Sequence, residues 1–402
     1  MTDFEIILCL ILCPYFAFIN FIKNPMIMNY SYKSVNFRKV VVFSLLLFTV
    51  LLSAQKKQKP LNVIFMIGDG MGVSQVTSAF YFGNSEPNFT QFKVVGLSET
   101  SSTSNLITDS AAGATALSTG KKTYKRAIGV DKDSIAIPTI LEQLQKNDYQ
   151  TGLVSLTSIT HATPASYYAH VKDRDLHEDI ALEFLKSNVD FAAGGGLKFF
   201  NKRKDGKNLL QELNKNYRID TVSLSKPVSG MRNLYLLAQD ELPNKVQGRG
   251  DFLPDATKNA LDYFSKSKKP FFLMVEGSFI DWGGHAKDAE MMTKEVLDFD
   301  KTIGVVIDYI KKNPNTLLVV TADHETGGAS IGKYSEKDVV TGKEKEVGNK
   351  VQVNFIDNQH TAALVPVFAI GKGQELFSGV YPNNTIYHKL VEALKKSGIK
   401  IK

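Results

Sequence analysis

The sequence predicts an α/β fold: a three-layer sandwich with a central, mostly parallel sheet that helices cover on both faces. Short apolar runs rich in β-branched residues recur along the 402-residue chain, and helical patterns separate them. Strands that are apolar throughout are typical of a parallel sheet buried on both faces, and their alternation with helices is typical of βαβ units. A hydrophobic content of 43% is enough for a large core.

Each expected element follows from its local pattern. The first strand, 63–67, is a continuous apolar run that ends at Gly68, Asp69 and Gly70. The other expected strands are runs of the same kind, at 151–155, 190–193, 271–275, 317–320 and 365–370. The expected helices are 137–146, 176–188, 288–312 and 385–397, of which 288–312 carries Val296, Ile303, Ile307 and Ile310 at helical spacing.

Two polar regions interrupt this alternation. Residues 197–256 are less regular and rich in Lys, Asn and Gly, and residues 329–359 include the alternating charges of Lys343, Glu344, Lys345 and Glu346. We expect both regions to be surface insertions, the second of them a candidate hairpin. Because no repeat or low-complexity linker divides the chain, a single domain over 55–402 is the simplest organisation.

The first 54 residues have the pattern of a secretory leader. Lys33, Arg38 and Lys39 precede an apolar run at 40–52, and the small residues Ser53 and Ala54 follow this run. A basic region, an apolar region and a small-residue cleavage site in this order are typical of a signal peptide. We expect cleavage after Ala54 and a secreted or periplasmic mature protein without stable membrane association.

A second apolar stretch, 4–22, lies upstream and is about long enough to span a membrane. Our interpretation is that translation starts at Met26 or Met28 and that this stretch is an over-extended start. The alternative is an N-terminal membrane anchor.

Composition narrows the class of protein further. Cys9 and Cys13 are the only cysteines and lie in the leader region, so the rest of the chain has no disulfide framework and no cysteine-based zinc site. Any metal there must be held by histidine and carboxylate. The formal net charge of +7 fits either a lysine-rich solvated surface or a field that attracts anionic substrates. The basic residues are scattered and not interleaved with aromatic residues, which argues against a nucleic-acid partner.

Ser110 is the candidate nucleophile. It follows Asp109 inside the small-residue run 108–115, at the expected start of a helix. The free backbone N–H groups and the positive dipole end of a helix start suit an oxyanion. A serine hydroxyl needs a base or a metal to ionise it, and no histidine lies near Ser110 in the sequence.

Three carboxylates come within three residues of the end of an expected strand: Asp69, Glu276 and Asp323. In parallel sheets, ligands bind beyond the carboxyl ends of the strands. We therefore expect these side chains at one edge of the sheet.

Histidines accompany these carboxylates. Asp281 and His285 are four residues apart, so that one helical turn or a tight glycine loop can direct both toward one ion. His324 follows Asp323, and His360 precedes the last expected strand. Aspartate, glutamate and histidine without cysteine suit Zn²⁺ or other divalent ions.

Taken singly, each signal has an ordinary explanation. An Asp and a His four residues apart are more often a surface pair, Asp323 could cap a helix, and Asp69 between glycines could be a turn residue. Their joint occurrence at or beside strand ends is what indicates a site. Of the seven histidines, His161, His285, His324 and His360 belong to this set, whereas His170, His177 and His388 are expected to be structural or surface residues.

Six segments resemble, in order, the successive motifs of the alkaline phosphatase family. They are 62–72, 108–120, 160–174, 272–285, 319–327 and 360–371. The resemblance runs from about residue 60 to about residue 400 and includes the runs Asp-Ser-Ala-Ala and Val-Glu-Gly-x-x-Ile-Asp-x-x-x-His.

The resemblance implies a role for each site residue. Ser110 would form a phosphoserine, and Arg174 would bind two phosphate oxygens with its planar fork. One Zn²⁺ would be held by Asp281, His285 and His360, and a second by Asp69, Asp323, His324 and the Ser110 oxygen. One Mg²⁺ would be held by Asp69, Thr163 and Glu276. Asp109, His161 and Trp282 would line the substrate site.

Two positions vary within the family. Enterobacterial members have Asp where this chain has His161 and Lys where it has Trp282, and mammalian-type members have His at both positions. The combination found here resembles some marine and cold-environment bacterial enzymes. The resemblance implies altered phosphate affinity and product release, and it leaves the identity of the third ion open. For Trp282 the alternative is a surface aromatic residue that packs on a loop.

The function that this resemblance implies is that of a secreted alkaline phosphatase, which releases inorganic phosphate and an alcohol from phosphate monoesters. Homodimers are common in the family. One alternative is a phosphodiesterase or sulfatase on the same scaffold, although the sulfatase motif Cys/Ser-x-Pro-x-Arg is absent from the sequence. Another is a zinc- or phosphate-binding protein without turnover.

Overall fold

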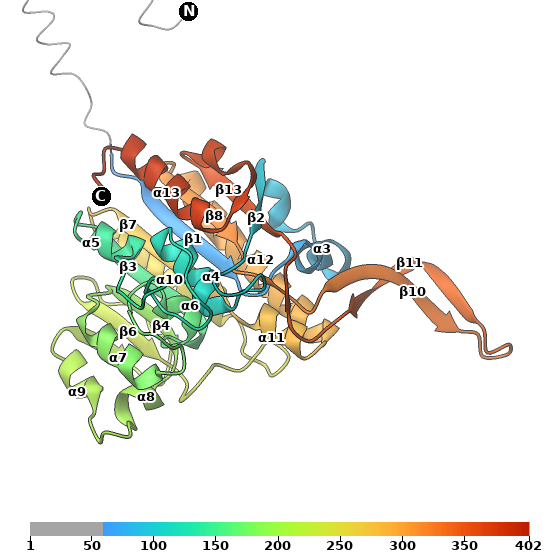
Figure 1. The fold of residues 1–402 in the computed structure, drawn as a ribbon, viewed down its shortest axis with the longest axis horizontal. Coiled ribbons are helices and arrows are strands. Elements are labelled where there is room, and N and C mark those ends of the chain that lie inside the picture. The colour runs from blue at the N-terminus through green and yellow to red at the C-terminus, as the bar shows by residue number, and fades with distance from the viewer. Residues whose placement is uncertain (1–58, 402) are drawn as a thin grey trace, which may run out of the picture. The chain divides into compact units, whose positions relative to one another are not determined.

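A computed structural model describes residues 59–401. The expected signal peptide, the two cysteines, the candidate starts and the 4–22 stretch all lie outside the described residues. Residues 59–401 form a ten-stranded sheet with helices on both faces (Figure 1), in the order β14-β2-β13-β8-β1-β7-β3-β4-β6-β5. The predicted α/β class, with a mostly parallel sheet between helical layers, is confirmed.

The sheet contains all six expected strands and four others. Their bounds are β1 (Asn62–Gly68), β2 (Val94–Glu99), β3 (Gln150–Ser158), β4 (Phe191–Gly195), β5 (Tyr217–Asp220), β6 (Arg232–Leu236), β7 (Phe271–Gly277), β8 (Thr316–Thr321), β13 (Val365–Gly371) and β14 (Gly379–Pro382). Among these described strands, β13 alone runs antiparallel to its neighbours β8 and β2. No helix lies between β8 and β13 in the chain, so β13 starts at the edge where β8 ends and runs back.

Alternate residues of the central strands face two separate cores. On β1, Val63 and Phe65 pack in one core, whereas Ile64 and Met66 pack in the other. This alternation is the period of two expected of a strand that is buried on both faces.

Helices cover both faces of the sheet (Figure 1). The first core is closed by α4 (Ser110–Thr119), α5 (Ile140–Gln145), α7 (His177–Lys186) and α13 (Asn384–Lys396). The second is closed by α3 (Val73–Phe82), α10 (Phe252–Ser265), α11 (Phe279–His285) and α12 (Ala289–Lys312). The remaining short helices are α6 (Ala162–Ala165), α8 (Lys198–Asn201) and α9 (Leu209–Leu213), together with the 3-10 turns Asn88–Gln91 and Gln374–Phe377.

One expected helix is shorter than its pattern indicated. The sequence predicts a helix over 137–146, but α5 begins only at Ile140. The hydroxyl of Thr139 accepts a hydrogen bond from the backbone of Glu142, and the Glu142 carboxylate accepts one from the backbone of Thr139. This reciprocal capping box begins the helix after Thr139.

The two polar regions have different structures. Residues 197–256, expected as an irregular surface insertion, contribute β6 and β5 to one end of the main sheet. Within 329–359, β10 (Ala329–Lys337) and β11 (Glu344–Phe355) form an antiparallel hairpin that projects from the body (Figure 1). At its base, β9 (Glu325–Thr326) pairs with β12 (His360–Thr361) in a separate ladder. Over residues 59–401, no helix combines the length and the apolarity that crossing a bilayer requires.

His170 lies in the loop before α7 and connects this loop to Glu142 on α5. Its Nδ1 lies 2.6 Å from the carbonyl oxygen of Gly129, and its Nε2 lies 3.0 Å from the Glu142 carboxylate. Burial lowers the pKa of His170, but the hydrogen bonds to Glu142 and Gly129 outweigh burial and raise this pKa above its ordinary value. With acceptors at both ring nitrogens, the protonated imidazole is the favoured form.

We predict that His170→Gln destabilises the protein more at pH 6 than at pH 9. A pKa raised by folding contributes stability that is fully present below the unfolded pKa, about 6.5, and that is lost as pH rises through the folded value. We expect a cost of about 1 kcal/mol at pH 6 and a smaller cost at pH 9. Thermal unfolding in chelator at both pH values measures the difference, and His388→Gln, at an exposed histidine on α13, is the control. An equal Tm shift at both pH values would contradict the prediction.

Candidate active site

The three buried carboxylates meet at one edge because β8, β1 and β7 are neighbours and run parallel. Asp69 directly follows β1, Asp323 lies just beyond β8, and Glu276 is near the end of β7. All three are at most 1% exposed. Burial raises the pKa of Asp69 well above its ordinary value, and repulsion from neighbouring carboxylates raises this pKa further. Such a concentration of buried negative charge favours binding of a cation.

A first group of ligands surrounds Asp281. Asp281 and His285 lie one turn apart on α11, so the helical alternative is the one that occurs. The Asp281 carboxylate lies 3.4 Å from His285 Nε2 and 3.5 Å from His360 Nε2, and the two Nε2 atoms are 3.1 Å apart. Burial raises the pKa of Asp281, but the hydrogen bond with His360 and the nearby imidazoles outweigh burial and lower it.

A second group surrounds His324. Its Nε2 lies 3.4 Å from Asp69 Oδ1, 3.3 Å from Asp323 Oδ2 and 3.2 Å from Ser110 Oγ. The rings of His324 and His360 stack with centroids 3.6 Å apart, which places the two groups side by side. Donor atoms in two overlapping sets lie within 4.8 Å of one another: Asp281, His324 and His360, and Asp69, Asp323 and His324.

Ser110 is the first residue of α4 and is 2% exposed. Asp109 caps this helix by accepting a hydrogen bond of 3.2 Å from the backbone N–H of Ala112. The small residues of the run allow α4 to pack closely on the site, since a Cβ added to Gly113 would lie 2.9 Å from the carbonyl oxygen of Asp323. Tertiary structure thus supplies what the sequence near Ser110 lacks, an imidazole beside its hydroxyl.

Arg174 is held by two of the expected substrate-site residues. Its guanidinium lies 3.2 Å from Asp109 Oδ2 and 3.3 Å from His161 Nε2. Burial lowers the pKa of His161 to about 3, and the charge of Arg174 acts in the same direction. His161 is therefore neutral at physiological pH, and its Nε2 accepts a hydrogen bond from Arg174.

Several buried oxygens have no hydrogen-bond partner. They are Asp69 Oδ1, Asp323 Oδ2, Thr163 Oγ1 and Glu276 Oε1. Leaving buried polar atoms unpaired is costly, and cation coordination is a direct way of satisfying them. The donor chemistry therefore fits a metal centre: imidazole and carboxylate suit Zn²⁺, and an oxygen-only set suits Mg²⁺.

A sequence profile described as "Alkaline phosphatase" matches residues 60–349, well over half of the chain. The chain belongs to the alkaline phosphatase family. Alkaline phosphatase 4 of Bacillus subtilis (strain 168) is 38% identical over 308 residues, which cover 71% of this chain and 66% of the relative. The chain therefore spans just under two thirds of that relative's length.

Solved structures extend the comparison. The alkaline phosphatase of the Antarctic bacterium TAB5 has a TM-score of 0.81 and 45% identity, covering 85% of this chain and 99% of its own. A TAB5 variant in which aspartate replaces a histidine has Mg bound in its M3 site, with a TM-score of 0.82, 45% identity and the same coverage. The expected family membership is thus confirmed.

Further residues of this alkaline phosphatase family member, which no pattern in its sequence marks, support the candidate ligands. The Thr326 hydroxyl donates to Asp281, and the Ser155 hydroxyl donates to Glu276 at 2.6 Å. Backbone carbonyls lie 2.6 Å from Nδ1 of His285 and 2.9 Å from Nδ1 of His360. These contacts hold the proton on Nδ1 and direct Nε2 toward the site. No sequence signal identifies a carbonyl, because every residue carries one.

Trp282 lies next to Asp281 on α11 and is 37% exposed. Its ring packs edge-on against Phe279, with centroids 4.7 Å apart and an interplanar angle of 62°. The indole therefore has a partner on its own helix and keeps a solvent-facing surface. His170 and His177 make hydrogen bonds away from Ser110, and His388 is exposed.

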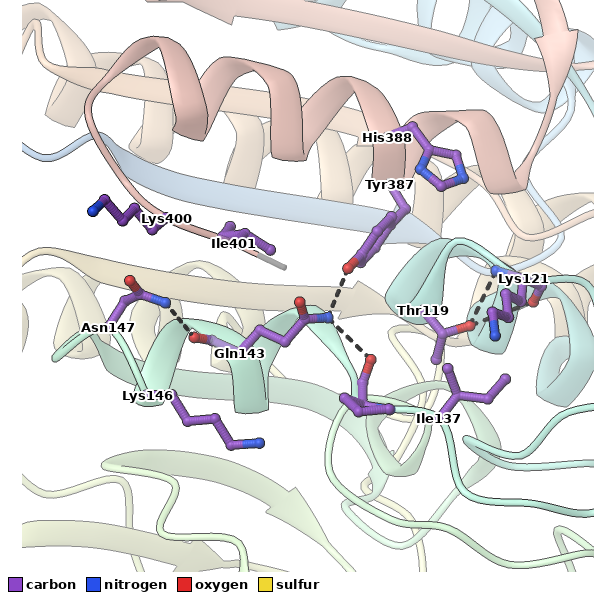
Figure 2. Close-up of a pocket in the computed structure, with 11 residues that line it drawn as sticks. Thr119, Lys121, Ile137, Gln143, Lys146, Asn147, Tyr387, His388, Lys400 and Ile401 are labelled. Carbon is purple, nitrogen blue, oxygen red and sulfur yellow. Dashed lines mark hydrogen bonds between the residues drawn. The ribbon is translucent and has the colours of Figure 1, made fainter.

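A cavity of about 680 Å³ lies at the far end of α4 and holds none of the candidate ligands. Thr119, which lines this cavity, lies roughly 13 Å along the helix from Ser110. Figure 2 shows Gln143 and Tyr387 directed toward each other there, with Gln143 Nε2 donating to Tyr387 Oη at 2.6 Å and to the Pro138 carbonyl at 3.1 Å. The polar groups at the centre of this cavity form hydrogen bonds with one another. The cavity is therefore separate from the candidate active site.

We predict that Gly70→Ala disrupts the metal site, whereas Gly206→Ala does not. Both glycines have positive φ, of 71° and 74°, and alanine in this region costs roughly 1–2 kcal/mol. Only at Gly70 would the new Cβ also lie 2.7 Å from the backbone of Asp281, whereas at Gly206 nothing lies within 4 Å. We expect zinc-induced stabilisation, measured as the Tm difference with and without Zn²⁺, to fall in Gly70→Ala alone. Equal Tm differences in both variants would contradict the prediction.

Proposed function

We propose that this protein hydrolyses phosphate monoesters through a phosphoserine formed on Ser110, releasing inorganic phosphate and an alcohol. The observation that carries the proposal is the position of Ser110 Oγ, 3.2 Å from His324 Nε2 where two candidate cation sites meet. The family supports it, since the relatives from Bacillus subtilis and TAB5 are named alkaline phosphatases.

The proposed ligand sets follow the contacts of the buried residues. One Zn²⁺ would be held by Asp281, His285 and His360, and a second by Asp69, Asp323, His324 and the Ser110 oxygen. A third ion, proposed as Mg²⁺, would be held by Asp69, Thr163 and Glu276, whose free oxygens support the assignment. When bound, the cations supply positive charge that favours ionisation of the Ser110 hydroxyl and offsets charge on the leaving oxygen.

The chain's own residues then account for two displacements at phosphorus. Ser110 Oγ attacks in line, its bond to phosphorus forms, and the bond to the alcohol oxygen breaks, after which that oxygen takes a proton. Water attacks the phosphoserine from the opposite side, the phosphorus–Oγ bond breaks, and Ser110 regains its proton. Arg174 holds two phosphoryl oxygens through both steps, kept in place by Asp109 and neutral His161.

We further propose that His161 and Trp282 tune this site. Arg174 is the cation that the described contacts place beside Asp109, and neither the neutral His161 nor the indole of Trp282 adds a positive charge. Lower phosphate affinity and faster product release follow, compared with family members that have lysine at the Trp282 position.

Export and assembly also belong to the proposal. We propose that residues 55–402 act as one catalytic domain, secreted to the periplasm or medium after cleavage at Ala54, and that it works as a homodimer. The basic-apolar-small pattern of 33–54 supports export. N-terminal sequencing and light scattering of the secreted product test these points, and a monomer, or a product that retains 4–22, would contradict them.

We predict that p-nitrophenyl phosphate hydrolysis at about pH 9 requires both metal and Ser110. Chelation should abolish the activity, and added Zn²⁺ and Mg²⁺ should restore it. Ser110→Ala should lower kcat by roughly 10³-fold or more, as nucleophile removal does in other enzymes with covalent intermediates. Ser104→Ala, at an exposed serine, is the matched control.

Three results would count against the proposed function: chelator-insensitive activity, full activity of Ser110→Ala, or faster hydrolysis of the bis-p-nitrophenyl diester than of the monoester. The diester result would favour a phosphodiesterase on the same scaffold. Tight zinc binding without a phosphoenzyme would favour a binding protein without turnover.

The Arg174→Lys variant tests whether the Arg174 guanidinium binds the phosphoryl group. Lysine keeps the charge but cannot form the two parallel hydrogen bonds of a guanidinium. Losing one charge-assisted bond, worth roughly 1.5–3 kcal/mol, should lower kcat/KM about tenfold to a hundredfold. Steady-state kinetics measures this loss, with Arg232→Lys on β6 as the control. An unchanged kcat/KM would show that Arg174 does not bind the phosphoryl group.

A further inference from the structure

The two histidines at the centre of the site are joined by a small ladder of backbone pairs. In this ladder β9 pairs with β12, with Thr326 opposite His360 and Glu325 opposite Thr361. His324 directly precedes β9, and its ring stacks on that of His360. The register of this two-residue ladder therefore sets how the two imidazoles face each other.

Glu325 lies in this ladder and is only 4% exposed. Its Oε1 accepts hydrogen bonds from Gln75 Nε2 at 2.7 Å and from the Ala329 N–H at 3.0 Å. Its Oε2 accepts one from the Gly328 N–H at 3.2 Å and one from the Thr361 hydroxyl. All four partners are donors, which matches the two acceptor oxygens of a carboxylate.

The four donors come from three separate segments. Thr361 is on β12, Gln75 is on α3, and Gly328 and Ala329 lie at the start of the projecting hairpin. Gln75 also donates to the Thr326 carbonyl at 2.8 Å, so α3 holds both residues of β9. The helix comes this close because residue 72 is glycine: a Cβ there would lie 2.4 Å from Glu325 Cγ. One carboxylate thus connects β12, which carries His360, and β9, which follows His324, to α3 and to the hairpin.

This carboxylate is held by neutral groups. Among the ion pairs within residues 59–401, none involves Glu325. Burying a carboxylate is costly unless it is hydrogen-bonded, and here four donors satisfy its two oxygens. The contacts of Glu325 therefore fix β9, which follows His324, against β12, which carries His360.

We propose that Glu325 is a positioning residue that holds His324 and His360 in the geometry for binding zinc, and so sets the zinc affinity of the site. It makes this contribution without touching substrate. The inference rests on the proposed function, because it takes those histidines as zinc ligands.

Substitutions of nearly equal size separate this role from simple packing. In Glu325→Gln, one acceptor oxygen becomes an NH₂ group that faces two donors, so those hydrogen bonds are lost without a cavity. Thr361→Val removes the hydroxyl and keeps the branched shape, whereas Thr361→Ser keeps the hydroxyl. Thr361 is half-buried on a short strand, so this pair tests the same contact even where Glu325→Gln fails to fold.

The experiment measures the zinc dissociation constant of the full protein by competition with a chromophoric chelator, together with the Tm of the metal-free form. Glu336→Gln, the same change at an exposed carboxylate on β10, is the matched control. We expect zinc affinity to fall about 10- to 100-fold in Glu325→Gln, as for other groups that orient metal ligands. Thr361→Val should show a smaller fall, and Thr361→Ser and Glu336→Gln should match wild type. At saturating zinc, KM for p-nitrophenyl phosphate should stay within about twofold of wild type.

Unchanged zinc affinity in both Glu325→Gln and Thr361→Val would overturn the proposal. So would a lower Tm of their metal-free forms with no change in zinc affinity, because the contact would then be purely structural. A wild-type protein that binds no zinc would instead overturn the proposed function, and this inference with it.

Discussion

Buried negative charge at the carboxyl ends of β8, β1 and β7 is the constraint on which the rest of the site depends. Three parallel neighbours bring Asp323, Asp69 and Glu276 together with at most 1% exposure. Burial raises the pKa of each, and with the charge of Asp281 it raises the pKa of Asp323 to about 7. Like charges repel strongly where the dielectric is low, so the group is stable in its ionised form when cations lie among its members.

The histidines contribute lone pairs to the same site. Burial lowers the pKa of His324 well below its ordinary value, which keeps the ring neutral and able to act as a ligand. The Nδ1 atoms of His285 and His360 face backbone carbonyls, so their Nε2 atoms point inward. The Thr326 hydroxyl and the Glu325 carboxylate extend these contacts to β9 and β12. The outer contacts therefore decide the direction in which each ligand atom points.

Close packing of small residues places the nucleophile against these ligands. Gly113 on α4 faces the carbonyl of Asp323, and Gly70 faces Asp281, each at a separation that leaves no room for a Cβ. Arg174 approaches from another segment and is held by Asp109, which also caps α4. The helix that carries Ser110 and the arginine that would hold phosphate thus share one carboxylate, which couples their positions.

The sequence by itself determined six of the ten strands of the sheet, the class of fold and the kinds of ligand. Continuous apolar runs form buried strands, and the carboxylates that follow three of these runs fall at the same edge. Asp281 and His285 have the spacing of one helical turn. Tertiary structure alone decided the direction of β13, the four outer strands β14, β2, β6 and β5, and the partners of Ser110 and Glu325. Ser110 and His324 are 214 positions apart, and no local pattern encodes such a contact. Their meeting depends on the order in which the strands pack and on how closely glycines let the segments approach.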